Sequence, residues 1–269
     1  MNVVYNVDCM EYMRSLPDKA LDLAVVDPPY FSGPERRGYY GTKVSSIGVH
    51  RDYPISPKWD VPQAPYFEEL DRVAKKYIVW GCNYFDYHFP TGRIVWDKCN
   101  GSSSFSDCEI AATNVHDSVR LFRYMWNGMC QGKSVTEGWI MQGDKRKNEK
   151  RIHPTQKPVA LYTWIFSRYA RPGDKILDTH LGSGSSRIAA YDAGLDFTGC
   201  EIDKHYFEEQ EERFAKHTAQ VSLWRSRHVR GTARGGQWDA TPGARLIWYT
   251  ADAKKRCKSV ERLRKAGLL

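Results

Sequence analysis

Short apolar runs alternate with amphipathic stretches along the first 215 residues of the chain. The apolar runs have the length of strands, and they lie at residues 2–8, 21–27, 77–81, 93–97, 175–178 and 197–202. The stretches with helical periodicity lie at residues 9–16, 158–170 and 186–194 and from residue 203 onward. Apolar strands that are separated by helices and bounded by turns are typical of a parallel sheet with both faces covered. The pattern therefore predicts an α/β fold with a doubly wound, mostly parallel sheet.

The second half of this pattern contains a strand, a glycine-rich turn, a helix and a strand that ends in an acid. Gly182 and Gly184 let a ligand approach the backbone closely, next to the free amides at the start of the following helix. Glu201 follows Asp178 by 23 residues, where a carboxylate accepts hydrogen bonds from ribose hydroxyls. Arg187 stands where a dinucleotide fingerprint has its third glycine. The unit favours a nucleoside cofactor over a dinucleotide, with a purely structural turn as the alternative.

The sequence Asp27-Pro28-Pro29-Tyr30 ends the second strand-like run. In an open α/β sheet, ligands bind outside the carboxyl ends of the strands, where Asp27 stands. The two prolines stiffen the turn and remove two amide donors, so that a main-chain carbonyl can point outward beside the carboxylate. These two acceptors suit an amino group, and Tyr30 adds a flat face for a planar ring. A proline-rich strand exit with an unrelated acid is the structural alternative.

Composition indicates a globular protein of the cytoplasm. The chain has 269 residues, 41% of them hydrophobic, which is enough for one large core. No apolar run approaches about 18 residues and no signal-peptide pattern opens the chain, so we expect no membrane span. The seven cysteines include no C-x-x-C pair, which favours reduced thiols and argues against a metal site.

Basic residues concentrate at the end of the chain. The net charge is +8, and residues 216–269 contain 13 Lys and Arg against three Asp and Glu. We therefore divide the chain into a catalytic body, residues 1–215, and a basic tail, residues 216–269, whose composition is typical of a partly disordered extension. Smaller basic clusters, at Arg36 and Arg37 and at residues 145–151, are better candidates for contact with the phosphates of nucleic acid.

Three motifs of the body resemble those of a known enzyme family. They are D-P-P-Y at 27–30, H-P-T-Q-K-P at 153–158, and L-D-T-H-L-G-S-G-S-S at 177–186 followed by G-C-E-I-D at 199–203. Together they resemble the S-adenosylmethionine-dependent amino-methyltransferases of DNA, and their order is similar to that of the permuted β group of adenine methyltransferases. The resemblance covers about residues 2–215. It implies a Rossmann-like methyltransferase fold with a circularly permuted motif order.

This resemblance implies a catalytic role for Asp27, Pro28, Pro29 and Tyr30. Asp27 and the carbonyl of Pro28 would accept the two hydrogens of the target amino group, whose nitrogen would take the methyl group directly, without a covalent enzyme intermediate. The base would leave the duplex, at a cost of a few kcal/mol, and stack on Tyr30.

The resemblance also implies which residues bind the cofactor. They are Asp8, His153, Thr155, Lys157, Asp178, Gly182, Ser183, Gly184 and Glu201. The glycine loop would surround the methionine end, Glu201 would bind the ribose, and Asp8 would read the adenine amino group. Thr155 and Lys157 would bind the methionine carboxylate. The structural alternatives are a helix cap for Thr155 or Asp8 and a surface charge for Lys157.

The chain departs from the family pattern at Thr179 and His180, where Pro-Phe is common after the strand acid. A histidine can replace the apolar edge of phenylalanine only while it is neutral, and its usual pKa is about 6.5. We therefore expect His180→Phe to keep activity and to flatten any loss of activity near pH 6.

Target recognition is assigned to a segment inserted at about residues 100–150, where the permuted enzymes keep theirs. Its Arg120, Arg123 and Lys133 could reach base edges or phosphates. The loop at residues 31–59, rich in Gly, Tyr and Arg, is long enough to close over a flipped base.

The sequence thus predicts a site-specific methyltransferase that acts on the 6-amino group of adenine in double-stranded DNA, as a monomer or a homodimer. Two alternatives stay open: a cytosine 4-amino methyltransferase, because the same clamp fits its amino group, and a non-catalytic DNA-binding relic of the fold. The intact Asp27, glycines and Glu201 favour an enzyme. A role in restriction-modification follows from the resemblance, with a cognate restriction enzyme left open as a partner.

Overall fold

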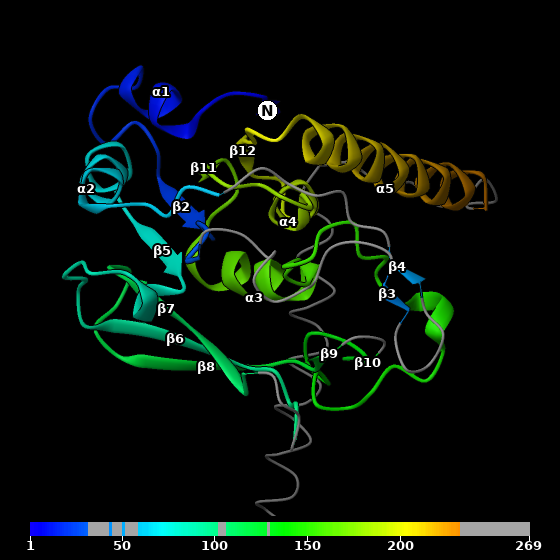
Figure 1. Ribbon diagram of the computed structural model, residues 1–269. Helices are drawn as coiled ribbons and strands as arrows, with labels where there is room; N and C mark the ends of the chain where they lie inside the picture. The colour runs from blue at the N-terminus through cyan, green and yellow to red at the C-terminus, as the bar shows by residue number, and fades with distance from the viewer. Residues whose placement is uncertain (32–42, 45–49, 52–58, 102–105, 128–129, 232–269) are drawn as a thin grey trace, which may run out of the picture. The chain divides into compact units, whose positions relative to one another are not determined.

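The computed structural model of the chain describes residues 1–31, 43–44, 50–51, 59–101, 106–127 and 130–231 (Figure 1). The chain divides into two units, Met1–Ala219 and Gln220–Leu269, and each is considered by itself. The first unit ends close to the predicted end of the body at residue 215. Of the second unit only the helical residues 220–231 are described, so most of the predicted basic tail lies outside the described residues, as do Arg36 and Arg37.

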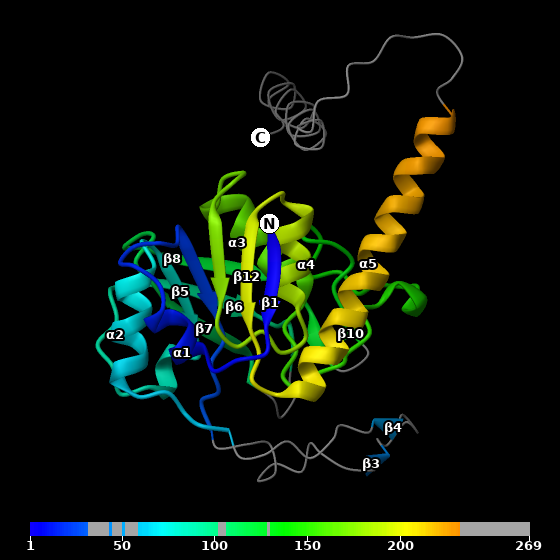
Figure 2. The same cartoon turned by 90° about the horizontal axis from the view of Figure 1, so that it is seen from above.

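Eight strands form the central sheet of the first unit (Figure 2). In spatial order they are β1 (Asn2–Tyr5), β12 (Asp196–Cys200), β11 (Lys175–Asp178), β2 (Leu23–Val26), β5 (Tyr77–Trp80), β7 (Cys108–Thr113), β6 (Gly92–Asp97) and β8 (Val119–Arg123). The strands from β1 to β5 in this order pair in parallel, β7 is antiparallel to both β5 and β6, and β8 is parallel to β6. Only β7 runs against the others, which confirms the predicted mostly parallel sheet.

Helices cover both faces of the sheet. Successive residues of β2 alternate between two hydrophobic clusters, because the side chains of a strand point to opposite faces. The cluster on one face packs against α1 (Cys9–Arg14) and α2 (Ala64–Val73), and the cluster on the other against α3 (Val159–Tyr169) and α4 (Ser185–Asp192). Burial on both faces explains why the strands read as continuous apolar runs rather than as alternating ones.

The strand order brings the separated sequence motifs to one edge of the sheet. β2, which leads into Asp27, pairs directly with β11, which ends at Asp178, although the two strands are far apart in sequence. Because these strands are parallel, the residues that follow them meet at the same edge. β7 runs in the opposite direction, so its first residues, including Glu109, also reach this edge.

The structure adds two strands that the sequence pattern did not predict. β7 and β8 lie within the predicted recognition segment of residues 100–150, so the first part of that segment belongs to the central sheet. β7 contains one Glu and two Ala residues, which have low strand propensity, and its position is decided by pairing with β5 and β6. The rest of the segment includes the short strands β9 (Trp126–Asn127) and β10 (Cys130–Gln131) and the 3₁₀ turn η3 (Lys145–Lys147).

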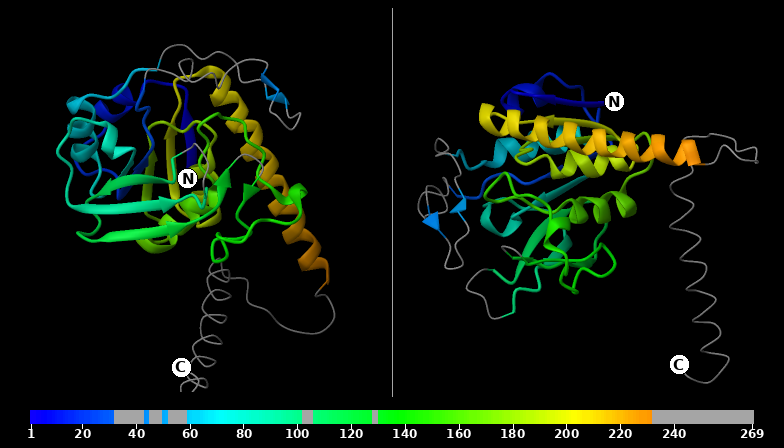
Figure 3. Two further views of the ribbon diagram at one scale, coloured as in Figure 1. Left: turned by 60° about the horizontal axis from the view of Figure 1, so that its bottom comes forward. Right: turned by 90° about the vertical axis from the view of Figure 1, so that its right-hand side faces the viewer.

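Two other segments complete the described chain. The predicted loop at residues 31–59 contains the paired strands β3 (Lys43–Val44) and β4 (His50–Arg51), and most of it lies outside the described residues. The last helix, α5 (Lys204–Gly231), is continuous through the predicted boundary at residue 215 (Figure 3).

Candidate active site

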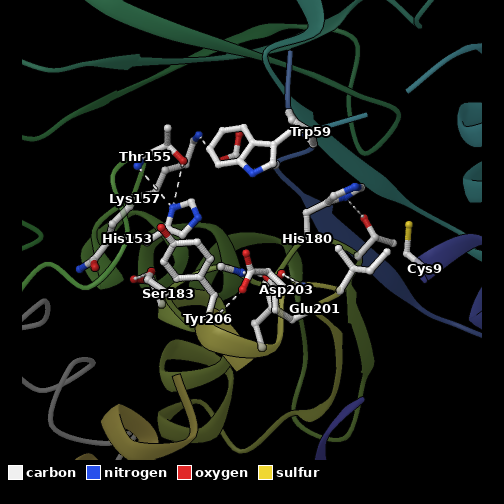
Figure 4. A pocket seen from close by; sticks show the side chains of 18 of the residues that line it. Cys9, Trp59, His153, Thr155, Lys157, His180, Ser183, Glu201, Asp203 and Tyr206 are labelled. Carbon is white, nitrogen blue, oxygen red and sulfur yellow. Dashed lines mark hydrogen bonds and ion pairs between the residues drawn. The ribbon is translucent and has the colours of Figure 1, made fainter. Parts of the chain in front are cut away.

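A cavity of about 320 Å³ opens at the carboxyl edge of the sheet, among the residues that follow β1, β2, β11 and β12 (Figure 4). Figure 4 shows His153, Thr155 and Lys157 on one side of it and His180 and Cys9 on the other. The residues from the predicted site that line the cavity are Asp8, Asp27, Pro29, His153, Thr155, Lys157, Gly182, Ser183 and Glu201. The structure therefore brings most of the predicted catalytic and cofactor residues together around one space.

Asp178 and Gly184 shape the glycine loop from outside the lining of the cavity. Asp178 is buried, and its carboxylate accepts hydrogen bonds from Ser186 Oγ at 2.5 Å and from the His180 amide at 3.1 Å. Burial raises the pKa of Asp178 to about 7. Gly184 precedes α4 with a φ of 72°, a left-handed conformation that favours glycine. These two residues hold the loop, whereas Gly182 and Ser183 face the ligand space.

Glu201 joins the end of β12 to the glycine loop. One of its carboxylate oxygens accepts a hydrogen bond from the Gly182 amide at 2.7 Å, and the other accepts one from the Asp203 amide at 2.9 Å. Burial raises the pKa of Glu201 to about 7, while these two amides oppose the rise. Each carboxylate oxygen has two lone pairs, so Glu201 keeps acceptor capacity toward the cavity, as binding of ribose hydroxyls requires.

The position of Asp8 is compatible with both roles considered for it in the sequence. It is the N-cap of α1, where its Oδ1 accepts hydrogen bonds from the amides of Met10 at 2.7 Å and Glu11 at 3.2 Å. It also lines the cavity. A helix cap and a cofactor contact are compatible here because the cap occupies one oxygen of the carboxylate.

His153 anchors the H-P-T-Q-K-P segment over the glycine loop. Its ring stacks on Trp59, with ring centroids 5.9 Å apart, and meets Tyr206 edge-on at 4.3 Å. Its Nδ1 lies 3.1 Å from Thr155 Oγ1, so Thr155 orients the ring rather than capping a helix. Burial lowers the pKa of His153 to about 3, so the ring is neutral near pH 7. Trp59 and Tyr206, which the sequence did not single out, belong to the same cavity wall.

The turn Asp27-Pro28-Pro29-Tyr30 places a carboxylate oxygen without a partner among the described residues at the cavity. Asp27 Oδ1 is buried and accepts no hydrogen bond from any residue that the structure describes. Asp27 Oδ2 forms an ion pair with Lys157 Nζ. Pro28 is buried and Pro29 lines the cavity. A buried carboxylate oxygen without a donor is costly, and it is the feature expected of an acceptor that waits for a substrate.

Tyr30 is the last residue of this turn and lies outside the cavity lining. Its ring stacks on the exposed Tyr84, with ring centroids 4.6 Å apart and an interplanar angle of 11°. Gly81, between β5 and the 3₁₀ turn η2 (Cys82–Tyr84), makes room for this ring: a Cβ at Gly81 would lie 2.4 Å from Tyr30 Cδ1. Contact of Tyr30 with a flipped base stays a prediction. Gly81 and Tyr84 are parts of the site that the sequence pattern did not reveal.

Lys157 is one of the most deeply buried cations of the described chain. Its side chain is 3% exposed, and its Nζ lies 3.0 Å from Glu109 Oε2 in addition to its ion pair with Asp27. Glu109 Oε1 in turn lies 2.5 Å from Lys98 Nζ. The surface-charge alternative for Lys157 is therefore wrong, and its predicted contact with a methionine carboxylate stays a prediction. Glu109 and Lys98 were missed because strand β7 was missed.

His180 is partly buried and lines the cavity, at the end of a short chain of hydroxyl groups. Tyr66 Oη lies 2.6 Å from Thr179 Oγ1, which lies 2.9 Å from His180 Nδ1. Burial lowers the pKa of His180 to about 4, although the nearby Asp8 opposes this. The ring is therefore neutral at pH 6, which corrects the expectation that its charge depends on conditions in that range. The histidine can offer the neutral edge that phenylalanine offers in the family pattern.

The predicted DNA-contacting residues lie on the surface of the first unit. Arg120 is exposed on β8, Arg123 Nε donates a hydrogen bond to Asp97 at 2.9 Å, and Lys133 pairs with Glu137 at 3.3 Å. The segment that follows β8 is attached to the H-P-T-Q-K-P motif, because Trp126 Nε1 donates a hydrogen bond to the main-chain oxygen of Gln156 at 2.8 Å. The recognition role of these residues stays a prediction.

The described residues contain neither a metal-binding cluster nor a membrane-spanning helix. No group of three or more His, Cys, Asp or Glu side chains in that part of the chain could hold a metal ion. None of its helices is long and apolar enough to span a bilayer.

Comparison with known proteins identifies the family. The N6/N4 methyltransferase family model, described as DNA methylase, matches residues 74–212, just over half of the chain. The type II methyltransferase M.HinfI of Haemophilus influenzae is 24% identical over 251 residues, which cover 79% of this chain and 68% of that protein. The type II methyltransferase M.HpaI of Haemophilus parainfluenzae is 25% identical over 237 residues, covering 77% and 72%.

A solved structure with a similar fold is the PvuII DNA methyltransferase (cytosine-N4-specific), with a TM-score of 0.50 and 12% identity, covering 80% of this chain and 86% of that one. This likeness concerns the fold alone. Taken with the family model and the strand order described above, it agrees with a Rossmann-like methyltransferase fold. The chain belongs to the DNA methylase family, the S-adenosylmethionine-dependent DNA amino-methyltransferases of the N6/N4 group.

Proposed function

We propose that the chain transfers a methyl group from S-adenosylmethionine to the 6-amino group of adenine in double-stranded DNA. The observation that carries this proposal is Asp27 Oδ1, a buried acceptor without a donor among the described residues that stands in a rigid turn beside the cavity. The two hydrogens of an exocyclic amino group fit Asp27 Oδ1 and the main-chain oxygen of Pro28. This grip would withdraw the nitrogen lone pair from conjugation with the base.

The residues around the cavity fit the proposed cofactor. Glu201 offers acceptors for ribose hydroxyls, and Asp8 keeps an oxygen for an amino group. Gly182 has a φ of 52° and lies beneath the His153 ring, so the loop forms a cradle without a side chain. The cofactor supplies a methyl group on a positively charged sulfur, which keeps the electron pair of the C–S bond as the N–C bond forms. The methylated nitrogen then releases one of its protons, to the Asp27 carboxylate or to water. The chain's part is to align the nitrogen with that bond and to exclude water.

DNA as the substrate is supported by a surface at the carboxyl end of β8. Trp139 and Met141 are 61% and 54% exposed. The preceding Gly138 lies just beyond the end of β8, because its main-chain oxygen accepts a hydrogen bond from the Met125 amide at 2.7 Å. Lys133 and the basic turn η3 flank this apolar row in the sequence. Apolar side chains within a basic surface suit the base stack of DNA, where a flipped base leaves a gap.

The choice of adenine rests on the D-P-P-Y motif and the motif order. The same clamp fits the 4-amino group of cytosine, and the cytosine-N4-specific PvuII methyltransferase shares the fold. Because both curated relatives are type II methyltransferases, we further propose that this chain modifies specific sites within a restriction-modification system.

The test is to incubate the protein with labelled cofactor and duplex DNA of mixed sequence, and then to digest the DNA to nucleosides. Labelled N6-methyldeoxyadenosine supports the proposal, labelled N4-methyldeoxycytidine replaces adenine by cytosine as the target, and cofactor binding without transfer indicates a relic. Asp27→Ala is the matched variant. It should lower turnover by about 100-fold or more while cofactor affinity stays within about twofold, because the acceptor that it removes, Asp27 Oδ1, acts on the amino group and not on the cofactor. An Asp27→Ala protein that methylates at the normal rate would refute the clamp.

A further inference from the structure

Four charged side chains of alternating sign form a row at the catalytic turn. Asp27 contacts Lys157, Lys157 contacts Glu109 at 3.0 Å, and Glu109 contacts Lys98 at 2.5 Å. Each of the four side chains is at most 20% exposed. Charged groups at such depth are rarely retained without partners, and here every cation lies between or beside carboxylates.

The row joins four separate elements. Asp27 follows β2, Lys157 belongs to the H-P-T-Q-K-P segment, Glu109 is the second residue of β7, and Lys98 follows β6. The two ammonium groups also lie over buried indoles: Lys157 Nζ is 5.8 Å from the Trp80 ring centroid, and Lys98 Nζ is 5.4 Å from that of Trp96. The antiparallel direction of β7 is what brings Glu109 to the catalytic edge.

The row leaves the Asp27 carboxylate with two unlike oxygens. Oδ2 is engaged by Lys157, and Oδ1 has no donor among the described residues. An ammonium group on one oxygen restricts rotation of the carboxylate, so the other oxygen keeps a fixed direction. The ammonium group of Lys157 is itself fixed, because it also contacts Glu109, and Glu109 in turn contacts Lys98.

The row also controls the charge of Asp27. Burial raises the pKa of Asp27, Lys157 opposes this rise, and Glu109 adds to it. Burial works against ionisation of Glu109 as well, but Lys157 and Lys98 outweigh it and hold the pKa of Glu109 below its usual range. Burial disfavours the charged form of Lys157 too, and its two carboxylate partners hold its pKa above the usual range. The titratable and charged groups that face Asp27 are Lys157, Glu109, Lys98, Tyr30, Tyr162 and Asp178.

We propose that Lys157 is a positioning residue for the catalytic carboxylate of Asp27, held in place by Glu109 and Lys98, rather than a ligand of the cofactor's methionine carboxylate. This inference rests on the proposed methyl transfer. Lys157 favours the ionised form of Asp27 and turns the carboxylate so that Oδ1 alone accepts from the target amino group. As the nitrogen gains positive charge in the transfer, the ionised carboxylate stabilises it at short range.

The first test separates the two roles of Lys157 by substitution with methionine, an unbranched side chain that is one atom shorter and carries no charge. A positioning role predicts that Lys157→Met lowers turnover by about 100-fold, while cofactor affinity measured by calorimetry changes less than about threefold. A cofactor role predicts instead that affinity falls by about tenfold or more. The second result would overturn the inference.

The second test uses the pH dependence of turnover, on which Glu109→Gln and Lys157→Met have opposite effects. Glu109→Gln removes a negative charge that disfavours ionised Asp27. The acid limb of the profile, which is the fall of turnover as the pH decreases, should therefore move to lower pH. Lys157→Met removes the cation that favours ionised Asp27, so the limb should move to higher pH, each by about one unit or more. Structural damage alone would lower turnover without shifting the limb in two directions. An acid limb that stays unchanged in both variants contradicts the inference.

Two controls complete the design. Lys75→Met breaks an exposed ion pair in which Lys75 Nζ lies 2.7 Å from Asp22 Oδ1. Asp22 precedes β2, at the edge of the sheet opposite the site, so this variant should leave the acid limb unchanged. If Lys157→Met fails to fold, the isosteric Glu109→Gln still tests the direction of the shift.

If wild-type protein methylates no duplex, the proposed function fails, and the inference is then decided by carbon NMR titration of Asp27 in cofactor-loaded wild-type and Glu109→Gln protein. A pKa of Asp27 that is not lower in the variant would refute it.

Discussion

Asp27 illustrates how single residues in this site acquire their properties from neighbours. Its carboxylate would be an ordinary strand-end acid in isolation, but burial and the ion pair with Lys157 make its two oxygens unlike. Gly81 has a similar dependence on context. Its importance lies in the Tyr30 ring, which occupies the space that any side chain at this position would need.

We predict that Gly81→Ala displaces Tyr30 and lowers turnover by about tenfold or more. The new Cβ would lie 2.4 Å from the Tyr30 ring, and the backbone at Gly81 has a φ of 70°. Gly194→Ala is the matched control, because Gly194 has the same φ of 70° but no atom within 4 Å of the position that a Cβ would take. Both variants should lose about 1–2 kcal/mol of stability through the backbone. Steady-state kinetics of both should show a loss of turnover for Gly81→Ala alone, and an equal loss in the two would contradict the role of the Tyr30 contact.

The pKa of Glu201 gives a prediction for cofactor binding. Burial raises this pKa to about 7, so the carboxyl binds a proton as the pH falls from 8 to 6. Ribose hydroxyls donate best to the ionised form, so the Kd of the cofactor should rise over this range, approaching tenfold per pH unit below the pKa. Glu201→Gln should bind more weakly at pH 8 and show a flatter dependence. Calorimetry at several pH values checks this, and an unchanged slope in Glu201→Gln would assign the proton to another group.

Among the elements, β7 and β8 and the segment that follows them distinguish this chain. The sheet ends at β8, whose carboxyl end leads to the exposed row of Trp139, Ile140 and Met141. Because β8 runs in the same direction as β2, this row belongs to the same edge of the sheet as Asp27. A surface that contacts DNA around a flipped base is expected at this edge.

We predict that Trp139→Ala raises the KM for DNA by about tenfold, since loss of stacking with a base costs about 1–3 kcal/mol. Val119→Ala is the control. Val119 is 66% exposed at the amino end of β8, on the opposite edge of the sheet, and its removal should leave the KM unchanged. Cofactor affinity should be the same in both variants. Equal DNA KM values for the two would place the DNA surface elsewhere.

At the scale of the whole molecule, all the residues that line the pocket belong to the unit Met1–Ala219. The contribution of α5 to the site comes from its first half, where Arg213 donates hydrogen bonds to the Ser183 oxygen at 2.7 Å and to Glu149 at 3.0 Å. The net positive charge of the sequence lies beyond these contacts, because residues 216–269 contain 13 Lys and Arg against three Asp and Glu.

We therefore predict that a chain ending at Gly231 keeps its cofactor affinity and turnover within about twofold of the full chain. Arg213→Ala, in the full chain, is the contrasting variant. It should weaken cofactor binding because it frees the glycine loop at Ser183 and leaves the half-buried Glu149 without its ion-pair partner. Calorimetry with the cofactor and single-turnover methylation check both, and loss of cofactor binding in the shortened chain would show that residues 232–269 support the pocket.

Much of the fold could be anticipated from local patterns. Every apolar run used in the prediction overlaps a strand of the sheet, because strands buried on both faces need continuous apolar sequence. β7 and β8 were not predicted, because their sequences show no clear run or alternation of buried apolar residues. Their strand conformation depends on pairing with the neighbouring strands of the sheet. In the site, the motif residues around Gly182 and Asp27 were found, whereas Trp59, Tyr84 and Glu109 were not.

Local sequence was sufficient for the alternation of strands and helices, the glycine loop and the stiff Asp-Pro-Pro-Tyr turn, because each depends on residues that are close in the chain. Tertiary structure alone decided that Lys157 meets Asp27 and Glu109, and that the pKa values of Glu201 and His180 shift in opposite directions. The physical reason is that ion pairs and desolvation depend on which distant segments the strand order brings together, and on how completely they exclude water.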